Sequence, residues 1–201
     1  MKSLRFRYLL LLAFVLQVSL PLQLQAQSKL QQWDDQVLIN LAESRTPEKT
    51  GFFLFISNHN DWVNVGVPVG LLAGGIIGND KQMRQNALYV ASSSAVNALA
   101  TMLIKKLVKR PRPFLANVKI RAVYQPSHYS FPSGHTSTAF TTATALSQAY
   151  PKWYVVVPSY LWAGSVGFSR LYLGVHYPTD VAAGALLGTG TAFSLRPLRA
   201  D

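Results

Sequence analysis

The sequence contains no cysteine. A chain without thiols forms no disulfide, offers no thiolate nucleophile and holds no metal through cysteine ligands. Disulfide-stapled folds, cysteine-dependent enzymes and cysteine-ligated metal sites are therefore excluded for this protein. The absence also fits an oxidising compartment in which the fold is maintained without disulfides.

Charged residues are scarce as well. They make up 13% of the chain, against roughly 25% in a typical soluble domain. From Phe131 to Leu195 the formal charges are limited to Lys152, Arg170 and Asp180. A soluble domain needs a charged, hydrated surface over such a length, whereas a bundle that faces lipid does not. With 49% hydrophobic residues in 201, the composition favours one membrane domain.

Acidic residues are few relative to basic ones. The 8 Asp and Glu residues against 19 Lys and Arg residues give a formal net charge of +11. Such an excess suits nucleic acid, anionic lipid or a phosphorylated substrate. The basic residues flank apolar segments and form no stripe with interleaved aromatics, so nucleic acid is disfavoured as a partner.

Residues 1–26 have the pattern of a secretory signal peptide, with a basic start, a short apolar stretch at residues 8–20 and a cleavage site after Ala26. The alternative is an uncleaved first transmembrane helix. The apolar stretch is short for that role, because crossing a membrane takes about 20 residues. Both interpretations place the chain from Gln27 onward outside the cytoplasm.

Apolar periodicity predicts helices throughout the rest of the chain, residues 27–201, which we interpret as a single domain. Residues 29–43 have the spacing of an amphipathic helix, which could lie on the membrane surface or pack on the protein. Glycines at positions 66, 70, 74 and 78 should let one helix approach a neighbour closely. Five apolar segments follow the amphipathic one, at residues 62–79, 85–104, 136–151, 153–169 and 181–195. We therefore expect an all-α, polytopic transmembrane bundle with about five spans.

Alternating these spans from an outer start places basic residues in every short inner connection and in the tail, as the positive-inside tendency requires. The inner residues are Lys81, Arg84, Lys152, Arg196 and Arg199. A second basic cluster, at residues 105–112, falls on the outer side, which indicates a functional use for its charge. We expect a multi-pass protein of the bacterial inner membrane with this cluster facing the periplasm.

Three outer stretches carry residue types suited to phosphate chemistry. Arginine forks grip two phosphate oxygens, and Ser133 and Gly134 precede an apolar helix, where free N–H groups attract an anion. His176 and Asp180 are four apart, so in a helical turn they would share a face, and the carboxylate would fix the imidazole tautomer. His135 can protonate a leaving oxygen. The stretches are residues 105–113, 132–135 and 169–180.

The order and spacing of these stretches resemble the type 2 phosphatidic acid phosphatase (PAP2) superfamily, which includes bacterial class A acid phosphatases and vanadium haloperoxidases. The family pattern is Lys-x6-Arg-Pro, then Pro-Ser-Gly-His, then Ser-Arg-x5-His-x3-Asp. All three parts are present and in order. They are matched by Lys105 with Arg112 and Pro113, by Pro132, Ser133, Gly134 and His135, and by Ser169, Arg170, His176 and Asp180.

The resemblance implies a membrane phosphatase in which His176 becomes phosphorylated, Asp180 orients it and His135 is the general acid. It implies neither a metal nor another cofactor. The residues that would bind the phosphate oxygens are Lys105, Arg112, Ser133, Gly134 and Arg170.

The implied substrate is a phospholipid or isoprenoid phosphate. Undecaprenyl pyrophosphate, phosphatidylglycerol phosphate, phosphatidic acid and lipid A phosphates all remain open. Three other classes stay as alternatives: a soluble periplasmic non-specific acid phosphatase, a vanadate-dependent haloperoxidase and a non-catalytic lipid-binding protein. We expect no catalytic role for five further basic residues, which should be at the surface or against lipid headgroups: His59, Lys106, Lys109, Arg110 and His128.

Overall fold

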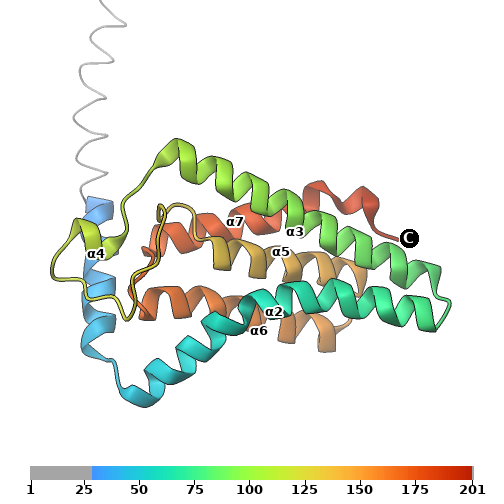
Figure 1. The fold of residues 1–201 in the computed structure, drawn as a ribbon, viewed down its shortest axis with the longest axis horizontal. Helices are drawn as coiled ribbons and strands as arrows, with labels where there is room; N and C mark the ends of the chain where they lie inside the picture. Colours follow the sequence, from blue (N-terminus) through green and yellow to red (C-terminus); the bar gives the residue numbers. More distant parts are fainter. Residues whose placement is uncertain (1–28, 201) are drawn as a thin grey trace, which may run out of the picture.

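The computed structural model describes residues 29–200, so the signal peptide predicted at residues 1–26 lies outside the described residues. Within residues 29–200 the secondary structure is helical and contains no strand. A helix at residues 29–43, called the N-terminal helix here, lies across one end of a bundle of long helices (Figure 1). The elements that follow are α2 (Pro47–Ile77), α3 (Lys81–Val108), α4 (Pro113–Ala116), α5 (Gly134–Ala149), α6 (Trp153–Tyr172), α7 (Pro178–Ser194) and the 3-10 turn η1 (Arg196–Leu198).

The five apolar segments of the sequence coincide with α2, α3, α5, α6 and α7 to within two residues at their carboxyl ends or lie inside them, which confirms the all-α bundle. Apart from α5, the helices are longer than the apolar segments, and α2 begins at Pro47 instead of near residue 62. The Thr46 side chain caps it by accepting from Lys49 N, and Pro47 occupies the first turn, where its missing N–H costs nothing. Among the described residues, Lys81–Ala116 is the one stretch whose length and hydropathy qualify it as a span by themselves. The count of about five spans stays a prediction.

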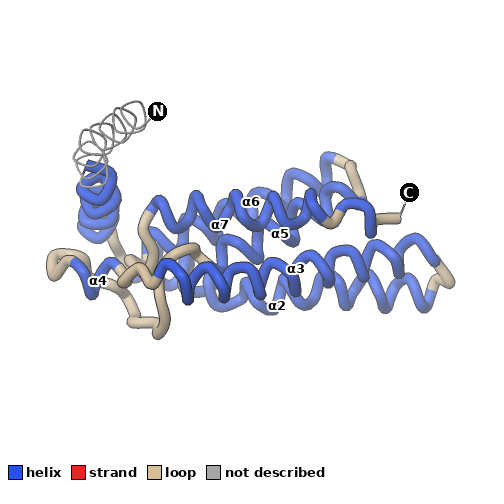
Figure 2. Tube along the Cα trace, turned by 90° about the horizontal axis from the view of Figure 1, so that it is seen from above, coloured by secondary structure: helices blue, strands red, loops and turns tan. Residues whose placement is uncertain are grey.

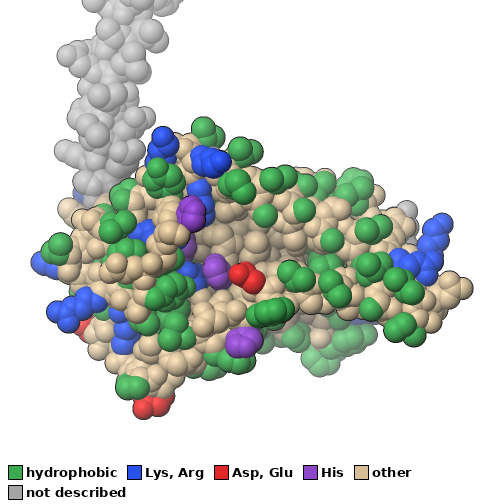
Figure 3. Space-filling model, viewed as in Figure 1, with side chains coloured by type: hydrophobic (Ala, Val, Ile, Leu, Met, Phe, Trp, Pro, Cys, Tyr) green, Lys and Arg blue, Asp and Glu red, His purple; other side chains and the backbone are tan. Residues whose placement is uncertain are grey.

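Helix α5 lies in the centre of the bundle, packed against α7, α6 and α3 (Figure 2). Most of its threonines and serines are buried, and several bond inside the bundle: Ser137 Oγ donates to Asn97 Oδ1, and Thr141 Oγ1 donates to Ser137 O at 2.8 Å. Large apolar side chains are exposed on the outer helix faces, as at Val65 and Leu186, and Figure 3 shows them along the bundle. An apolar surface around a core with many polar side chains suits a lipid environment.

Two glycines let α7 lie directly against α5. A Cβ added at Gly184 would be 2.6 Å from Ser133 O, and one at Gly188 would overlap Ser137 O. The expected role of the glycine series in α2 is wrong for its first two members, because Gly66 and Gly70 face open space. Spacing alone places glycines on one face of a helix, but the rest of the bundle decides which face meets a neighbour.

The three motif stretches lie at one end of the bundle, beside the N-terminal helix (Figure 1). The opposite end contains the α2–α3 turn, the α5–α6 connection and the carboxyl-terminal turn. The α2–α3 turn is closed by Asp80, whose carboxylate accepts from Met83 N at 2.9 Å. Because the long helices alternate in direction, all links that carry the motifs emerge on the same side.

Candidate active site

His176 lies in the short link between α6 and α7, with 2% of its surface exposed. The link turns at Gly174, whose φ of +72° is one that residues with a side chain rarely adopt. The expectation that His176 and Asp180 share a helical turn is therefore wrong, since His176 precedes the first residue of α7. A capping interaction joins them instead. The carboxylate of Asp180 reaches back to accept from Tyr177 N at 3.0 Å, which places Oδ2 3.4 Å from His176 Nδ1.

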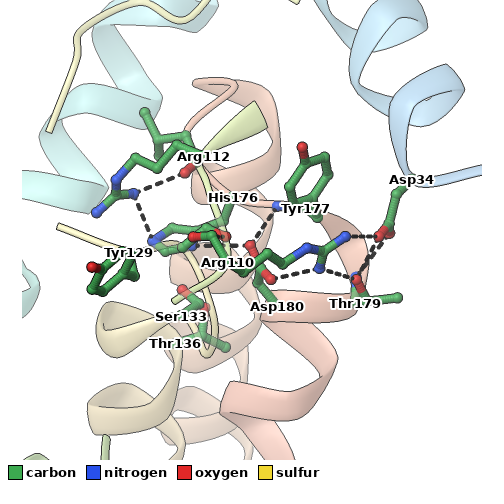
Figure 4. A network of polar contacts seen from close by, with 12 residues as sticks. Asp34, Arg110, Arg112, Tyr129, Ser133, Thr136, His176, Tyr177, Thr179 and Asp180 are labelled. Atoms are coloured by element: carbon green, nitrogen blue, oxygen red, sulfur yellow. Dashed lines mark hydrogen bonds and ion pairs between the residues drawn. The ribbon is translucent and has the colours of Figure 1, made fainter. Parts of the chain in front are cut away.

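The other imidazole nitrogen faces Arg112. Arg112 Nη1 lies 3.3 Å from His176 Nε2 and donates to Val175 O at 2.9 Å (Figure 4). Because a guanidinium only donates, Nε2 is the acceptor and the ring proton sits on Nδ1, toward Asp180. Burial, with the charges of Arg170, Arg112 and Lys105, holds the pKa of His176 well below its usual value and keeps the ring neutral.

The loop before α5 aims two cations at the histidine. Arg112 Nε donates to His128 O at 3.0 Å, and Nη2 donates to Ser127 O at 2.9 Å. Lys105, in the last turn of α3, donates from Nζ to Tyr129 O at 2.6 Å. Backbone carbonyls thus accept hydrogen bonds from Lys105 and Arg112 and fix both side chains. Because a carbonyl carries no formal charge, the two positive charges stay uncompensated.

Arg170 is the third cation, in the last turn of α6 with 2% of its surface exposed. Its Nη1 donates to Ser57 Oγ and to Tyr124 OH, and its Nε has no hydrogen-bond partner within residues 29–200. Burying a guanidinium without a paired carboxylate is costly. In the described part of the chain, neither Lys105, Arg112 nor Arg170 forms an ion pair. Three unpaired cations that act on one histidine make a candidate anion site.

The first turn of α5 forms another wall of this site. Ser133 precedes the helix, and its N–H donates to Asp180 O at 3.0 Å, which ties the second motif to the third. Its hydroxyl bonds to Thr136 Oγ1 at 2.9 Å. The helix starts at Gly134, so the amides of its first turn have no carbonyl within the helix to bond to. His135, the next residue, is in the electrostatic field of Arg170, Asp61 and Arg112.

Figure 3 shows the face of the molecule on which histidines and basic side chains gather around a hollow at this end of the bundle. The structure thus brings together all eight residues that the sequence singled out. Five of them are helical: Lys105, Gly134, His135, Arg170 and Asp180. The others, Arg112, Ser133 and His176, lie just before a helix or in a link.

Sequence reasoning missed several residues that support the site. The expectation that Arg110 is solvated is wrong, because its side chain is 20% exposed and pairs with Asp34 and Asp180. Two buried carboxylates need a cation between them, and Arg110 is the one in reach. Ser57 and Tyr124, which hold Arg170, carry no motif either. Two neighbouring lysines of the basic run, at positions 106 and 109, are exposed as expected.

A helical bundle with a buried histidine and unpaired cations at one end defines a class of membrane proteins with a histidine-centred anion site. Comparison with protein families identifies the superfamily within this class. Residues 86–200 match the model of the PAP2 superfamily, and the chain belongs to it.

Relatives include an undecaprenyl-diphosphatase of Sulfolobus acidocaldarius, 33% identical over 114 residues, which are 56% of this chain and 55% of that protein. A decaprenylphosphoryl-5-phosphoribose phosphatase of Mycobacterium tuberculosis is 36% identical over 116 residues, 57% of this chain and 61% of that protein. The chain therefore spans 55% and 61% of the length of these two relatives.

A solved structure with a similar fold is the transmembrane PAP2-type phosphatidylglycerolphosphate phosphatase of Bacillus subtilis. Its TM-score is 0.68 at 23% identity, covering 83% of this chain and 84% of that one. With its exposed apolar helix faces, the chain is a membrane protein built on this fold.

Proposed function

We propose that the protein is a membrane phosphatase that hydrolyses a lipid phosphate or pyrophosphate through a phosphohistidine on His176. The observation that carries this proposal is the arrangement around that ring. Nδ1 faces a carboxylate, Nε2 faces Arg112, and the unpaired charges of Lys105 and Arg170 act on the same histidine. A neutral imidazole among cations suits attack on an anionic phosphorus centre.

The first step transfers the phosphoryl group to the protein. His176 Nε2 attacks phosphorus, so an N–P bond forms while the bond from phosphorus to the lipid oxygen breaks. The phosphate oxygens take over the Nη1 donor of Arg112 that lies 3.3 Å from Nε2 in the free protein. His135 gives its proton to the departing oxygen. Asp180 stabilises the positive charge that develops on the His176 ring, and its 3.4 Å contact shortens as that charge grows.

The second step releases inorganic phosphate. Water attacks the phosphorus atom of phosphohistidine, His135 accepts the proton from that water, and the N–P bond breaks with its electron pair returning to Nε2. Lys105, Arg112 and Arg170 stabilise the added negative charge in both steps, with the amides of Ser133 and Gly134 at the helix start. Both proton positions and the neutral ring are thereby restored.

The class of substrate follows from the surroundings of the site. The hollow with the cations is at one end of an apolar bundle (Figure 3), where the headgroup of a lipid lies while its tail stays in the membrane. Relatives named for undecaprenyl diphosphate and decaprenylphosphoryl-phosphoribose support an isoprenoid phosphate in particular. We place the protein in a bacterial inner membrane with the site facing the periplasm.

The test is phosphate release by purified protein in detergent micelles from undecaprenyl pyrophosphate, phosphatidylglycerol phosphate, phosphatidic acid and lipid A. The His176→Ala variant should lose about 10³-fold or more in kcat, because the group that forms the bond is gone. An acid-labile phosphoenzyme should be trapped from a labelled substrate in the wild type and be missing in this variant.

The matched control is His59→Ala, which removes an exposed histidine of α2 whose ring bonds to Phe55 O in its own helix. It should keep wild-type kcat. Unchanged phosphate release by His176→Ala would refute the mechanism, and no release from any of the four lipids would refute the proposed activity.

A further inference from the structure

A series of charged side chains connects the N-terminal helix to the histidine–aspartate pair. Arg110 lies at its centre: Nη1 donates to Asp180 Oδ1 at 2.7 Å, and Nη2 donates to Asp34 Oδ2 at 2.8 Å (Figure 4). Both carboxylates are fully buried. Water therefore does not screen these pairs, and each carboxylate depends on the guanidinium for compensation.

Arg110 determines how the carboxylate of Asp180 is rotated. Oδ1 accepts from Arg110, while Oδ2 accepts from Tyr177 N at 3.0 Å and faces His176 Nδ1 at 3.4 Å. Rotation about the Cβ–Cγ bond would exchange the two oxygens and turn the plane of the group. With a donor on each oxygen the group has one orientation, and that orientation points an oxygen at the histidine.

Asp34 in turn fixes Arg110. Asp34 accepts from Thr179 N at 3.0 Å and from the Thr179 hydroxyl, and this hydroxyl also accepts from Arg110 Nη1 at 2.7 Å. Gln31, one turn earlier in the N-terminal helix, adds a second acceptor for Nη2 at 2.8 Å. The three side chains of Asp34, Arg110 and Thr179 form a closed ring next to Asp180, and each member is held by two others.

Stacking restricts the guanidinium further. Its Cζ lies 3.8 Å from the centroid of the Tyr177 ring, a short cation–π distance. A planar fork can stack and bond to two carboxylates at once, whereas the compact ammonium of a lysine cannot. The geometry thus uses properties that belong to arginine and not only to its charge.

We propose that Arg110 is a positioning residue for the proposed reaction, anchored by Asp34 of the N-terminal helix, and that it orients Asp180 toward His176. The proposal rests on the proposed function, since it assigns the support of its nucleophile. It also gives the N-terminal helix a role: that helix supplies Asp34, the second of the two buried carboxylates that pair with the guanidinium.

The experiment compares Arg110→Gln and Asp34→Asn with Lys106→Gln, which removes the same charge from an exposed position four residues earlier. In the two ring variants kcat should fall by about 10- to 100-fold, the range found when a group that orients a functional histidine is lost. KM should change little, because neither residue contacts substrate. Lys106→Gln should match the wild type.

Two further readouts separate positioning from a general loss of structure. Arg110→Lys should recover less than the full kcat although it restores the charge, because it cannot hold both carboxylates. The double variant Arg110→Gln with Asp34→Asn should be no slower than Arg110→Gln alone, because both changes break one ring. Additive losses, or full recovery by lysine, would overturn the proposal.

The pH profile gives a third readout. The charged and titratable groups around Asp180 are Arg110, His176, Tyr177, Lys105 and Arg112, and Asp34 lies beyond Arg110. Without the guanidinium the carboxylate of Asp180 takes up a proton more readily, and once protonated it no longer stabilises positive charge on His176. The loss of kcat/KM in acid should therefore begin at higher pH in Arg110→Gln than in the wild type. If Arg110→Gln lowers kcat but leaves the acidic limb of kcat/KM at the wild-type pH, the effect is purely structural and the proposal is contradicted.

NMR of protein labelled at histidine tests the positioning by Arg110 independently of whether a lipid is hydrolysed. The His176 ring signals, assigned by their loss in His176→Ala, should shift in Arg110→Gln and Asp34→Asn and stay in place in Lys106→Gln. If no lipid is hydrolysed but these shifts occur, the proposed function fails and the positioning stands. If hydrolysis occurs and the signals do not shift, the positioning fails alone.

Discussion

Among the four histidines of residues 29–200, His176 is the most deeply buried. Its ring differs from an exposed histidine through the charges around it, since Arg170, Arg112 and Lys105 all oppose a proton on it. His59, by contrast, is exposed and bonds only to Phe55 O within its own helix. Residue type alone does not separate the proposed nucleophile from a surface histidine, whereas burial and neighbouring charge do.

The lowered pKa of His176 predicts how activity depends on acid. A neutral ring is required for attack, and an ordinary histidine is protonated below a pH of about 6.5. Because burial and neighbouring cations lower the pKa of His176, kcat/KM should persist below that pH and fall only as the pH approaches the lowered value. Since kcat/KM reports the free protein, its acidic limb is the measurement that tests this.

Lys105→Met sharpens the same prediction. Lys105 is one of the cations that lower the pKa of His176, so its removal should raise that pKa and shift the acidic limb to higher pH. The exposed Lys106→Met serves as the control. A limb that lies at an ordinary histidine value in the wild type and stays there in Lys105→Met would contradict this account.

At the scale of helices, the contact between α5 and α7 holds the second motif against the third, because Ser133 N donates to Asp180 O. Gly188→Ala should push these helices apart, since the added methyl overlaps the Ser137 carbonyl. Overpacking of this kind costs about 1–3 kcal/mol. Thermal unfolding in detergent should show a lower midpoint, and activity should fall along with it.

Gly190→Ala is the matched control on the same helix. A Cβ there meets nothing within 4 Å, and replacing a helical glycine by alanine favours the helix by up to about 1 kcal/mol. Its midpoint should be equal to or above that of the wild type. Equal destabilisation by both substitutions would contradict this account, because the open position 190 has no close contact to disturb.

The helices themselves could be predicted from the sequence, because long apolar segments without charge leave few other structures in a membrane. Their ends could not. The start of α2 depends on the Thr46 cap, well outside the apolar segment. The pairing of His176 with Asp180 was expected for the wrong reason, because the motif spacing suggested a shared turn and the structure uses a helix cap.

The ring around Arg110 shows where sequence reasoning ends. Asp34 and Thr179 are 145 positions apart, and nothing in either local sequence indicates that they meet. Within the basic run, Lys109 and Arg110 look alike as charges, yet the first is exposed and the second is held between two carboxylates. Only the fold of the chain, which brings the N-terminal helix to the start of α7, separates them.

At the scale of the whole molecule, charge is divided between the two ends of the bundle. The motif end holds the cations of the site, and the opposite end holds the basic residues of the short connections, such as Lys81 and Lys152 (Figure 1). Basic connections are retained on the cytoplasmic side. At the motif end, Lys105 and Arg112 are held by backbone carbonyls and Arg110 by two buried carboxylates, so we attribute these cations to the site and not to the orientation of the protein in the membrane.

This division predicts which positions can be reached from outside the cell. The native chain has no cysteine, so single cysteines can be introduced without removing others. Lys119→Cys in the exposed loop of the motif end should react with a membrane-impermeant maleimide in intact spheroplasts. Lys152→Cys and Lys81→Cys, at the opposite end, should react only after the membrane is permeabilised.

The reverse pattern would refute a periplasmic site, and reaction of all three before permeabilisation would refute a bundle that crosses the membrane. Because labelling needs no turnover, the orientation is tested independently of the reaction and of the lipid on which it acts.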